Sequence, residues 1–262
     1  MSFAISSGHS KYVAGAIGIV KEVEEARKIV DRIVDLADDI MPVHKFHDDT
    51  SRTQKENINR IVAFHNNCNR RADYSMHLNA STGKQDRDIG VEVLYYSDAN
   101  RKHAEDLASA LSQATGLKSR GAKKRTDLGF LKETNKPAFL IEAYFVNSRA
   151  DVSKMDEAHE INAFAAAFVQ TVAKYLGLSY QTSSTKPHKI KTGTYTSEKA
   201  AENARQLMGK YCLASVNWSY VIKDGDYYRV ITGTYPSKIA ADNAIQKMRD
   251  KNILKDASAF AV

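Results

Sequence analysis

The clearest signal of a fold class is an apolar run, Ala138-Phe-Leu-Ile-Glu-Ala-Tyr-Phe-Val146. Strands of a parallel sheet that are covered on both faces have continuous apolar runs of this kind. The run therefore predicts a central strand of an α/β sheet. Glu142 interrupts it, and because burying an unpaired carboxylate is costly, such a residue is usually paired, bound to a metal or catalytic. Burial would also raise the pKa of its carboxyl, which suits a general base that works near neutral pH.

Two further predicted strands bring histidines to the same sheet. The short strand Phe3-Ala-Ile-Ser leads into the small-residue turn Ser7-Gly-His-Ser10. This turn would expose His9 at the carboxyl end of a strand, where ligands and catalytic groups of open α/β sheets collect. The stretch Asp73-Tyr-Ser-Met-His-Leu-Asn-Ala80 predicts another strand, in which His77 shares one face with the other odd-numbered positions. Taken singly, each histidine is better explained as an ordinary loop or core residue.

A helix is predicted from about Val20 to Ile40, because its apolar residues recur at helical spacing. Three acids open this helix, Glu22, Glu24 and Glu25, and their simplest role is to complement the helix dipole. Only Glu22 lines up with the inward-facing apolar positions, whereas Glu24 lies on the wet face and Glu25 is intermediate. A carboxylate at the border of a buried face needs a cation, so Glu22 is expected to bind one. Glu25 stays open as the alternative, because the sequence does not fix the helix register.

Considered together, these side chains form a chemically meaningful set. His9, Glu22, His77 and Glu142 all fall at strand ends or at a helix start. Two histidines and one glutamate are a known ligand set of catalytic zinc, which keeps a fourth position open for water. A glutamate that does not bind the metal can then serve as the base. The joint occurrence weakens the purely structural explanation that holds for each residue alone.

The sequence after residue 180 has a different organisation. Thr192–Ala204 matches Thr232–Ala244 at an offset of 40 residues, and each copy joins an alternating strand to an amphipathic helix. Further strands are predicted over residues 213–222 and 257–262, which gives the order βαββαβ of a ferredoxin-like α+β domain. The polar stretch before this repeat is typical of a linker. We therefore predict two domains, residues 1–180 and 188–262, joined by a linker over residues 181–187.

The composition narrows the function classes. This 262-residue chain has 38 Lys and Arg residues and 31 Asp and Glu residues. After residue 180 there are 13 basic and 7 acidic residues, which give a net charge of +6. The net charge of residues 1–180 is only +1. This asymmetry indicates docking on a polyanion, either an anionic cell wall or nucleic acid, with simple solubility as the alternative. A hydrophobic fraction of 43% excludes intrinsic disorder. No apolar stretch reaches the roughly 20 residues of a transmembrane helix. Cys68 and Cys212 lack metal-type spacing and are predicted to be reduced thiols.

Several short motifs occur in one order over about residues 1–176. They are Gly8-His9, Gly15-Ala16, Glu22, Ser75-Met-His77-Leu-Asn79-Ala, Gly90-Val-Glu-Val, Arg120-Gly-Ala and Ile141-Glu142-Ala-Tyr-Phe-Val-Asn147. With them the chain resembles the zinc-dependent N-acetylmuramoyl-L-alanine amidases of the amidase-3 type. The resemblance implies His9, Glu22 and His77 as ligands of Zn²⁺ and Glu142 as the catalytic acid and base. The family's first motif is often Pro-Gly-His-Gly-Gly, and the form Ser7-Gly-His-Ser-Lys found here is similar to phage endolysin amidases.

The C-terminal repeat carries a second resemblance. Tyr228-Arg-Val-Ile-Thr-Gly-Thr-Tyr-Pro-Ser, followed by Ala240-Ala and Ala244, is similar to the SPOR domain, a peptidoglycan-binding module, over roughly residues 187–262. The resemblance implies that glycan strands bind on the face of its sheet. The residues expected on that face are Tyr220, Tyr228, Arg229 and Thr232.

These expectations combine into a monomeric, bacteriolytic peptidoglycan hydrolase that cuts the amide between N-acetylmuramic acid and L-alanine. Arg120 is expected to bind a carboxylate of the stem peptide. A zinc peptidase that cuts within the stem peptide and a wall-binding protein with an inactive catalytic domain stay open, whereas the strand at Tyr227 lacks the signature of an RNA-recognition module. The first residues show no secretory signal. We therefore expect synthesis in the cytoplasm and release to a Gram-positive wall through a holin or lysis, with a phage endolysin favoured over an autolysin.

Overall fold

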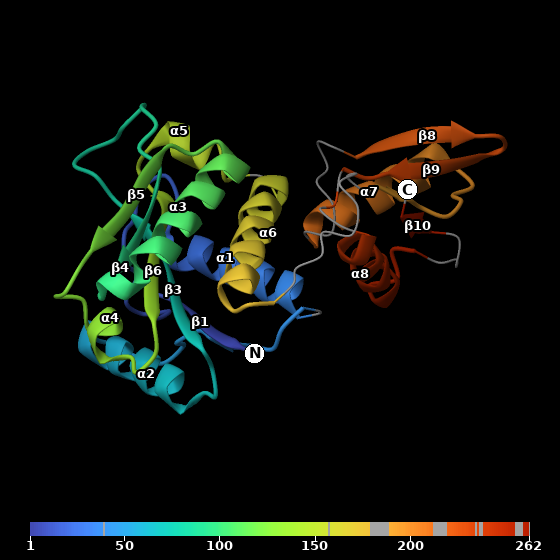
Figure 1. The fold of residues 1–262 in the computed structure, drawn as a ribbon. Helices are drawn as coiled ribbons and strands as arrows, with labels where there is room; N and C mark the ends of the chain where they lie inside the picture. The colour runs from blue at the N-terminus through green and yellow to red at the C-terminus, as the bar shows by residue number, and fades with distance from the viewer. Residues whose placement is uncertain are drawn as a thin grey trace. The chain divides into compact units, whose positions relative to one another are not determined.

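The computed structural model describes residues 1–38, 40–156, 158–178, 189–211, 219–233, 235, 238–254 and 259–261. The chain divides into two compact units close to residue 180, and each unit is described by itself (Figure 1). The predicted linker over residues 181–187, Cys212 and most of the strand predicted over residues 213–222 lie outside the described residues. Within the described ranges, no helix is both long enough and apolar enough to cross a bilayer.

A six-stranded sheet with the strand order β2-β1-β3-β6-β4-β5 forms the centre of the first unit. The strands are β1 (Phe3–Ser7), β2 (Val43–Phe46), β3 (Ala72–Asn79), β4 (Val91–Tyr95), β5 (Ser119–Lys124) and β6 (Ala138–Phe145). The strands β2, β1, β3 and β6 are parallel to one another, whereas β4 is antiparallel to β6 and β5 is parallel to β4. The predicted, mostly parallel α/β sheet is confirmed. Its apolar run forms β6, which is central but has one antiparallel neighbour.

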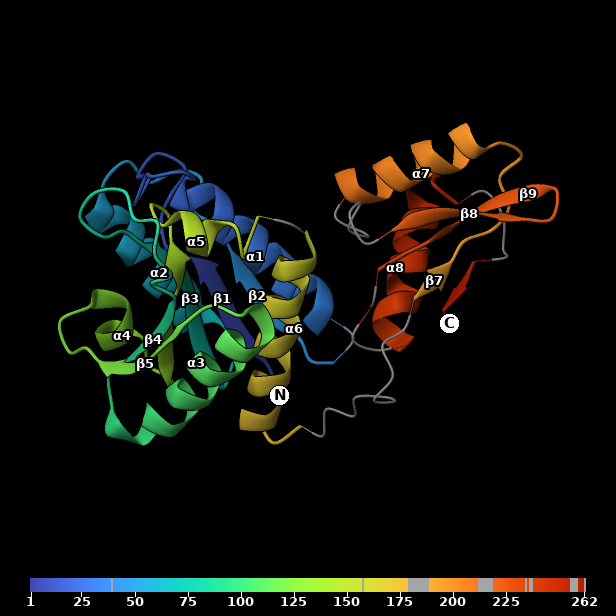
Figure 2. The ribbon, with the colours of Figure 1, turned by 90° about the horizontal axis from the view of Figure 1, so that it is seen from above.

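Helices cover both faces of this sheet (Figure 2). They are α1 (Glu22–Ala37), α2 (Gln54–Asn67), α3 (Arg101–Thr115), α4 (Gly129–Glu133), α5 (Arg149–Val152) and α6 (Ala158–Tyr175), with a 3₁₀ turn at Asp98–Asn100. The main core contains apolar side chains of α1, α3 and α6 and one set of alternating strand residues. A smaller cluster contains side chains of α2 and α4 and the opposite set, such as Leu140. The side chains of one strand reach both clusters because successive residues of a strand point to opposite faces of the sheet.

The same alternation positions the candidate site. His77 and Glu142 are register partners on the adjacent parallel strands β3 and β6. Both share the sheet face of Leu140, because side chains two positions apart point to the same side of a strand. His77 lies near the carboxyl end of β3, and the α1 helix begins beside it at Glu22, whose side chain contacts the His77 ring.

The second unit is a four-stranded antiparallel sheet with two helices. Its elements are β7 (Ile190–Lys191), α7 (Glu198–Lys210), β8 (Tyr220–Asp224), β9 (Tyr227–Ile231), α8 (Lys238–Asp250) and β10 (Phe260–Ala261). The strand order is β10-β7-β9-β8, and the element order βαββαβ confirms the prediction. Buried side chains of both helices, such as Met208 and Met248, pack against Val230 of β9 in a core of their own.

Two of the residues expected on the glycan-binding sheet face do not fit it. Tyr228 is partly buried and packs against the core of this unit, on the same side of β9 as Val230. Thr232 is fully buried, and its hydroxyl accepts a hydrogen bond from the Ile190 backbone N–H at 2.9 Å. Thr232 therefore joins β7 to the strand beside it and cannot contact a polymer. Tyr220 has half of its surface exposed, at 50%. Arg229 is partly buried and pairs with Asp224.

Candidate metal centre

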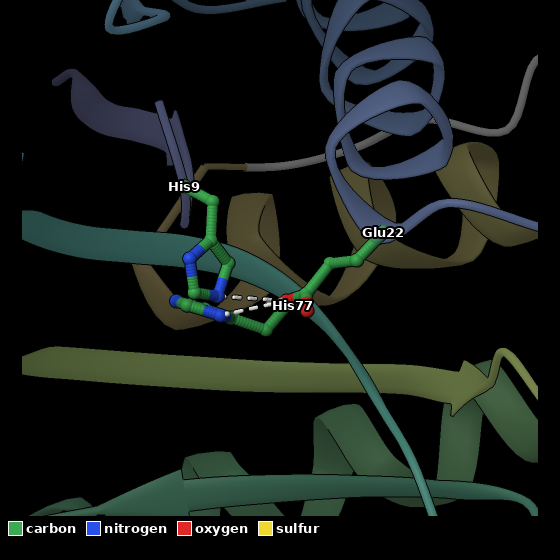
Figure 3. A group of neighbouring side chains, drawn as sticks. All are labelled: His9, Glu22 and His77. Carbon is green, nitrogen blue, oxygen red and sulfur yellow. Dashed lines mark hydrogen bonds and ion pairs between the residues drawn. The ribbon is translucent and has the colours of Figure 1, made fainter. Parts of the chain in front are cut away.

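Three side chains from three elements meet at one point of the first unit (Figure 3). His9 follows β1, Glu22 opens α1 and His77 lies on β3. The His9 Nε2 atom is 3.3 Å from Glu22 Oε1, and the His77 Nδ1 atom is 3.0 Å from the same oxygen. Possible ligand atoms of the three residues all lie within 4.8 Å of one another. Two imidazoles and a carboxylate at this spacing could hold a metal ion.

Two glycines leave the space that these side chains occupy. A Cβ atom on Gly8 would lie 1.9 Å from the His77 ring. Gly15 has a φ of +64°, and a Cβ atom there would lie 2.4 Å from Glu22 Oε2 and 2.6 Å from the His9 ring. Any larger residue would therefore push the three side chains apart. This explains why a glycine precedes the first histidine and why another occurs in the loop before α1.

Glu22 is held on both of its oxygens. Its Oε2 accepts a hydrogen bond from the Ala16 N–H at 2.7 Å, and its Oε1 accepts one from the Leu78 N–H at 3.0 Å. Burial alone would raise the pKa of this carboxyl, but hydrogen bonds from His77 and His9 outweigh it and lower the pKa well below its usual range. The pKa of His77 is raised, because its hydrogen bond to Glu22 outweighs the opposing effect of burial. Glu22 is therefore an anion that favours cations beside it.

The other two acids of the first helical turn have different partners. Glu25 accepts a hydrogen bond from Lys28 at 2.6 Å and lies 3.4 Å from the Tyr144 hydroxyl. Glu24 is exposed and pairs with Lys21 at 2.9 Å. Among the three acids, only Glu22 contacts the histidines in the described structure. The helix register thus places the Glu25 alternative away from this cluster.

Glu142 lies beside the cluster without a hydrogen-bonding partner. Its side chain is partly exposed, yet its Oε2 atom is buried, and no described residue donates a hydrogen bond to it. Burial raises the pKa of Glu142 to about 7, and the negative charges of Glu22 and Glu92 add to this effect, while His77 opposes it. Glu142 can therefore exchange a proton near neutral pH.

Arg120 is held by a residue that the sequence did not single out. Its Nε donates a hydrogen bond to Glu92 Oε2 at 2.7 Å, and its guanidinium lies 5.1 Å from the centre of the Phe145 ring. Glu92 lies directly opposite Glu142 on the antiparallel strands β4 and β6. The stretch Val91-Glu-Val-Leu-Tyr95 is an apolar strand that is interrupted by one carboxylate. The same pattern singled out Glu142, so it could also have identified Glu92 from the sequence.

Comparison with known proteins decides the family. The family model of N-acetylmuramoyl-L-alanine amidase, Amidase_3, matches residues 4–174. The chain belongs to this family. The SPOR domain model matches residues 184–258, so the amidase domain is followed by a SPOR domain.

Relatives of this amidase-family chain include two curated proteins of Clostridium perfringens. One is an uncharacterised 38.4 kDa protein, 26% identical over 158 residues, which are 58% of this chain and 45% of the relative. The other is also uncharacterised, 26% identical over 156 residues, which are 58% of this chain and 46% of the relative. The chain therefore spans about half the length of the curated relatives that it matches.

Solved structures share the fold of the amidase domain. The catalytic domain of the CD27L endolysin, described as targeting Clostridia Difficile, is 25% identical, with a TM-score of 0.57 over 68% of this chain and 98% of that domain. The CwlD amidase of Clostridioides difficile, solved with the GerS lipoprotein, is 22% identical. The match has a TM-score of 0.61 and covers 67% of this chain and 98% of that one. The catalytic domain of the CwlV amidase of Bacillus (Paenibacillus) polymyxa is 20% identical. The match has a TM-score of 0.58 and covers 68% of this chain and 100% of that domain.

Proposed function

We propose that this protein is a zinc-dependent amidase of peptidoglycan that cleaves the bond between the lactyl group of N-acetylmuramic acid and L-alanine. One observation carries the proposal. In a chain of the amidase family, His9, Glu22 and His77 converge on one point, and the unpartnered carboxyl of Glu142 lies on the strand beside His77. This is the arrangement that a metal-assisted hydrolysis of an amide requires.

The residues of the cluster fit a zinc ion by their chemistry and by their packing. His9, Glu22 and His77 would hold it through two imidazole nitrogens and one carboxylate oxygen, which is a donor set of catalytic zinc. Gly8 and Gly15 keep this space free of side chains. When bound, the metal supplies Lewis-acid chemistry, which polarises a carbonyl and makes water more acidic.

Glu142 would move the proton of the reaction. As a carboxylate it takes a proton from the attacking water, whose oxygen forms the new bond to the amide carbon. It then returns that proton to the alanine nitrogen as the carbon–nitrogen bond breaks, so that the products are a free carboxyl and a free amine. The buried, unpartnered Oε2 atom of Glu142 leaves this carboxyl free to accept the proton and then to donate it. Changing Glu142 to Gln should lower the rate by about 10²-fold to 10⁴-fold.

We further propose that the SPOR domain holds the enzyme on the wall. Residues 181–262 carry the net charge of +6, which favours an anionic wall. Tethering would raise the local concentration of substrate around the catalytic unit. Cleavage of many stem peptides would weaken the wall, so we propose a bacteriolytic role for a monomeric protein.

The test is incubation of the purified full-length protein with Gram-positive peptidoglycan, followed by mass spectrometry of the products. One sample receives EDTA, and a second receives EDTA and then zinc. We expect stem peptides with a free L-alanine amino terminus, their loss with EDTA and their return with zinc. Fragments cut inside the stem peptide would instead identify a peptidase. No release by a protein that still sediments with the wall would leave only a binding function.

A further inference from the structure

Two cations of strand β5 converge on one buried carboxylate. Glu92 is almost fully buried, and its Oε2 accepts hydrogen bonds from the Arg120 Nε at 2.7 Å and from the Lys123 Nζ. Burial alone would raise the pKa of Glu92, but the hydrogen bonds from Lys123 and Arg120 outweigh it and lower the pKa. The three ionised groups carry a net charge of +1. This cluster therefore has an excess of one positive charge beside the proposed catalytic residue.

Arg120 still has hydrogen-bond donors that are not used by any residue that the structure describes. Among the described residues, its only hydrogen bond runs from Nε to Glu92, so that Nη1 and Nη2 are left for a ligand. The guanidinium is fixed from two sides, by Glu92 and by the face of the Phe145 ring. About a third of the Arg120 side chain, 32%, is exposed. A fixed guanidinium with two donors free is suited to a bidentate carboxylate ligand.

The position of the cluster matches the length of a peptide. His77, Glu142 and Glu92 lie side by side on β3, β6 and β4. Because neighbouring strands are about 4.8 Å apart, His77 and Glu92 are separated by roughly 10 Å. An extended peptide covers this distance in about three residues. A stem peptide whose first amide lies at the metal cluster beside His77 would thus carry its second or third residue to Glu92 and the Arg120 side chain bound to it.

We propose that Arg120 and Lys123, anchored on Glu92, form a subsite for a carboxylate of the stem peptide, so that the enzyme prefers stems with free carboxylates over stems in which they are amidated. The inference rests on the proposed function and adds the substrate class to it. Glu92 acts here as a positioning residue, because it touches the two cations and not the substrate.

The test compares two soluble muramoyl-peptides that differ only in whether the carboxylates of the stem are free or converted to amides. Full-length zinc-loaded protein and the variants Arg120→Gln, Lys123→Gln and Lys124→Gln are assayed on both. Lys124 is the matched control, because it is a lysine of the same strand that pairs with Asp98 at 2.6 Å instead of Glu92. We expect the unchanged protein to prefer the free carboxylate by about tenfold or more in kcat/KM.

The ratio of the two kcat/KM values separates binding from a merely structural role. Arg120→Gln and Lys123→Gln should bring the ratio toward one, mainly through KM, whereas Lys124→Gln should keep it. Equal losses on both substrates in the first two variants would overturn the subsite. So would an unchanged protein that cleaves both substrates equally well, while the amidase proposal would stand. Failure of the unchanged protein on both substrates would overturn the amidase proposal and the subsite with it.

Discussion

At the scale of single residues, Glu142 carries a carboxyl group in a place where ionisation is costly. Its pKa is raised from 4.5 to about 7 in the folded protein, because its Oε2 is buried and unpartnered. The folded state therefore holds the proton more tightly than the unfolded chain does. The resulting stabilisation is complete below about pH 4.5 and is lost as the pH rises to about 7.

Glu142→Gln should reveal this loss in the metal-free protein. The glutamine cannot ionise, so the Tm of the variant should exceed that of the unchanged protein by an amount that grows between about pH 4.5 and 7 and is constant above. Differential scanning fluorimetry in EDTA over this range measures the difference. A difference that does not change with pH would show that the Glu142 carboxyl has an ordinary pKa.

Gly15 gives a second prediction at this scale. Gly15→Ala would place a methyl group 2.4 Å from Glu22 Oε2 at a positive φ, so we expect the affinity for zinc to fall by about 10-fold to 100-fold. Gly116→Ala is the matched control, because Gly116 has a φ of +71° and open space around its Cβ position. Titration with a competing chelator measures both affinities. Equal losses in the two variants would mean that backbone strain, and not the crowding of Glu22, is responsible.

At the scale of elements, the local patterns predicted the strands and the helix that carry the site. The apolar run around Glu142 became β6, the alternation around His77 became β3, and the helical spacing after Glu22 became α1. The reversed direction of β4 was not predictable, because pairing of strands about 50 residues apart depends on contacts that no local pattern records. For the same reason the sequence could not show that Glu92 faces Glu142. The prediction was wrong for Thr232 and Tyr228, because the alternation of side chains does not distinguish the open face of a sheet from the face that helices cover.

The junction of β4, β6 and α5 gives a prediction of stability. Asp151 is fully buried on α5, and its carboxylate accepts hydrogen bonds from three backbone N–H groups, those of Ile89, Gly90 and Phe145, at 2.8, 2.9 and 3.0 Å. Asp151→Ala leaves these donors buried without an acceptor. We expect the free energy of unfolding to fall by about 3 kcal/mol or more.

Urea unfolding followed by circular dichroism measures this change. Asp98→Ala is the control, because Asp98 is exposed and pairs with Lys124 at the surface, where an ion pair contributes little to stability. Similar losses in the two variants would show that water satisfies the backbone donors around Asp151. A large loss confined to Asp151→Ala would identify the junction as the element that fixes β4 beside Glu142.

At the scale of the whole molecule, the uneven distribution of charge allows the proposed wall binding to be tested separately from the proposed catalysis. The excess of positive charge lies after residue 180, whereas the side chains of the metal cluster are largely buried in the first unit. The distance over which exposed charges interact, the Debye length, falls from about 10 Å at 0.1 M salt to about 3 Å at 1 M. We therefore expect added NaCl to release Glu142→Gln protein from intact walls, while the unchanged protein keeps its rate on a small neutral muramoyl-peptide.

Sedimentation with purified walls at increasing NaCl measures the bound fraction. A single charge can be tested in each unit, because Lys223 is exposed on β8 of the second unit and Lys102 is exposed on α3 of the first. Lys223→Gln should weaken wall binding at low salt, and Lys102→Gln should not. If binding is the same at all salt concentrations and in both variants, then neutral contacts such as those of the exposed Tyr220 hold the glycan. The net charge of +6 would then contribute to solubility alone.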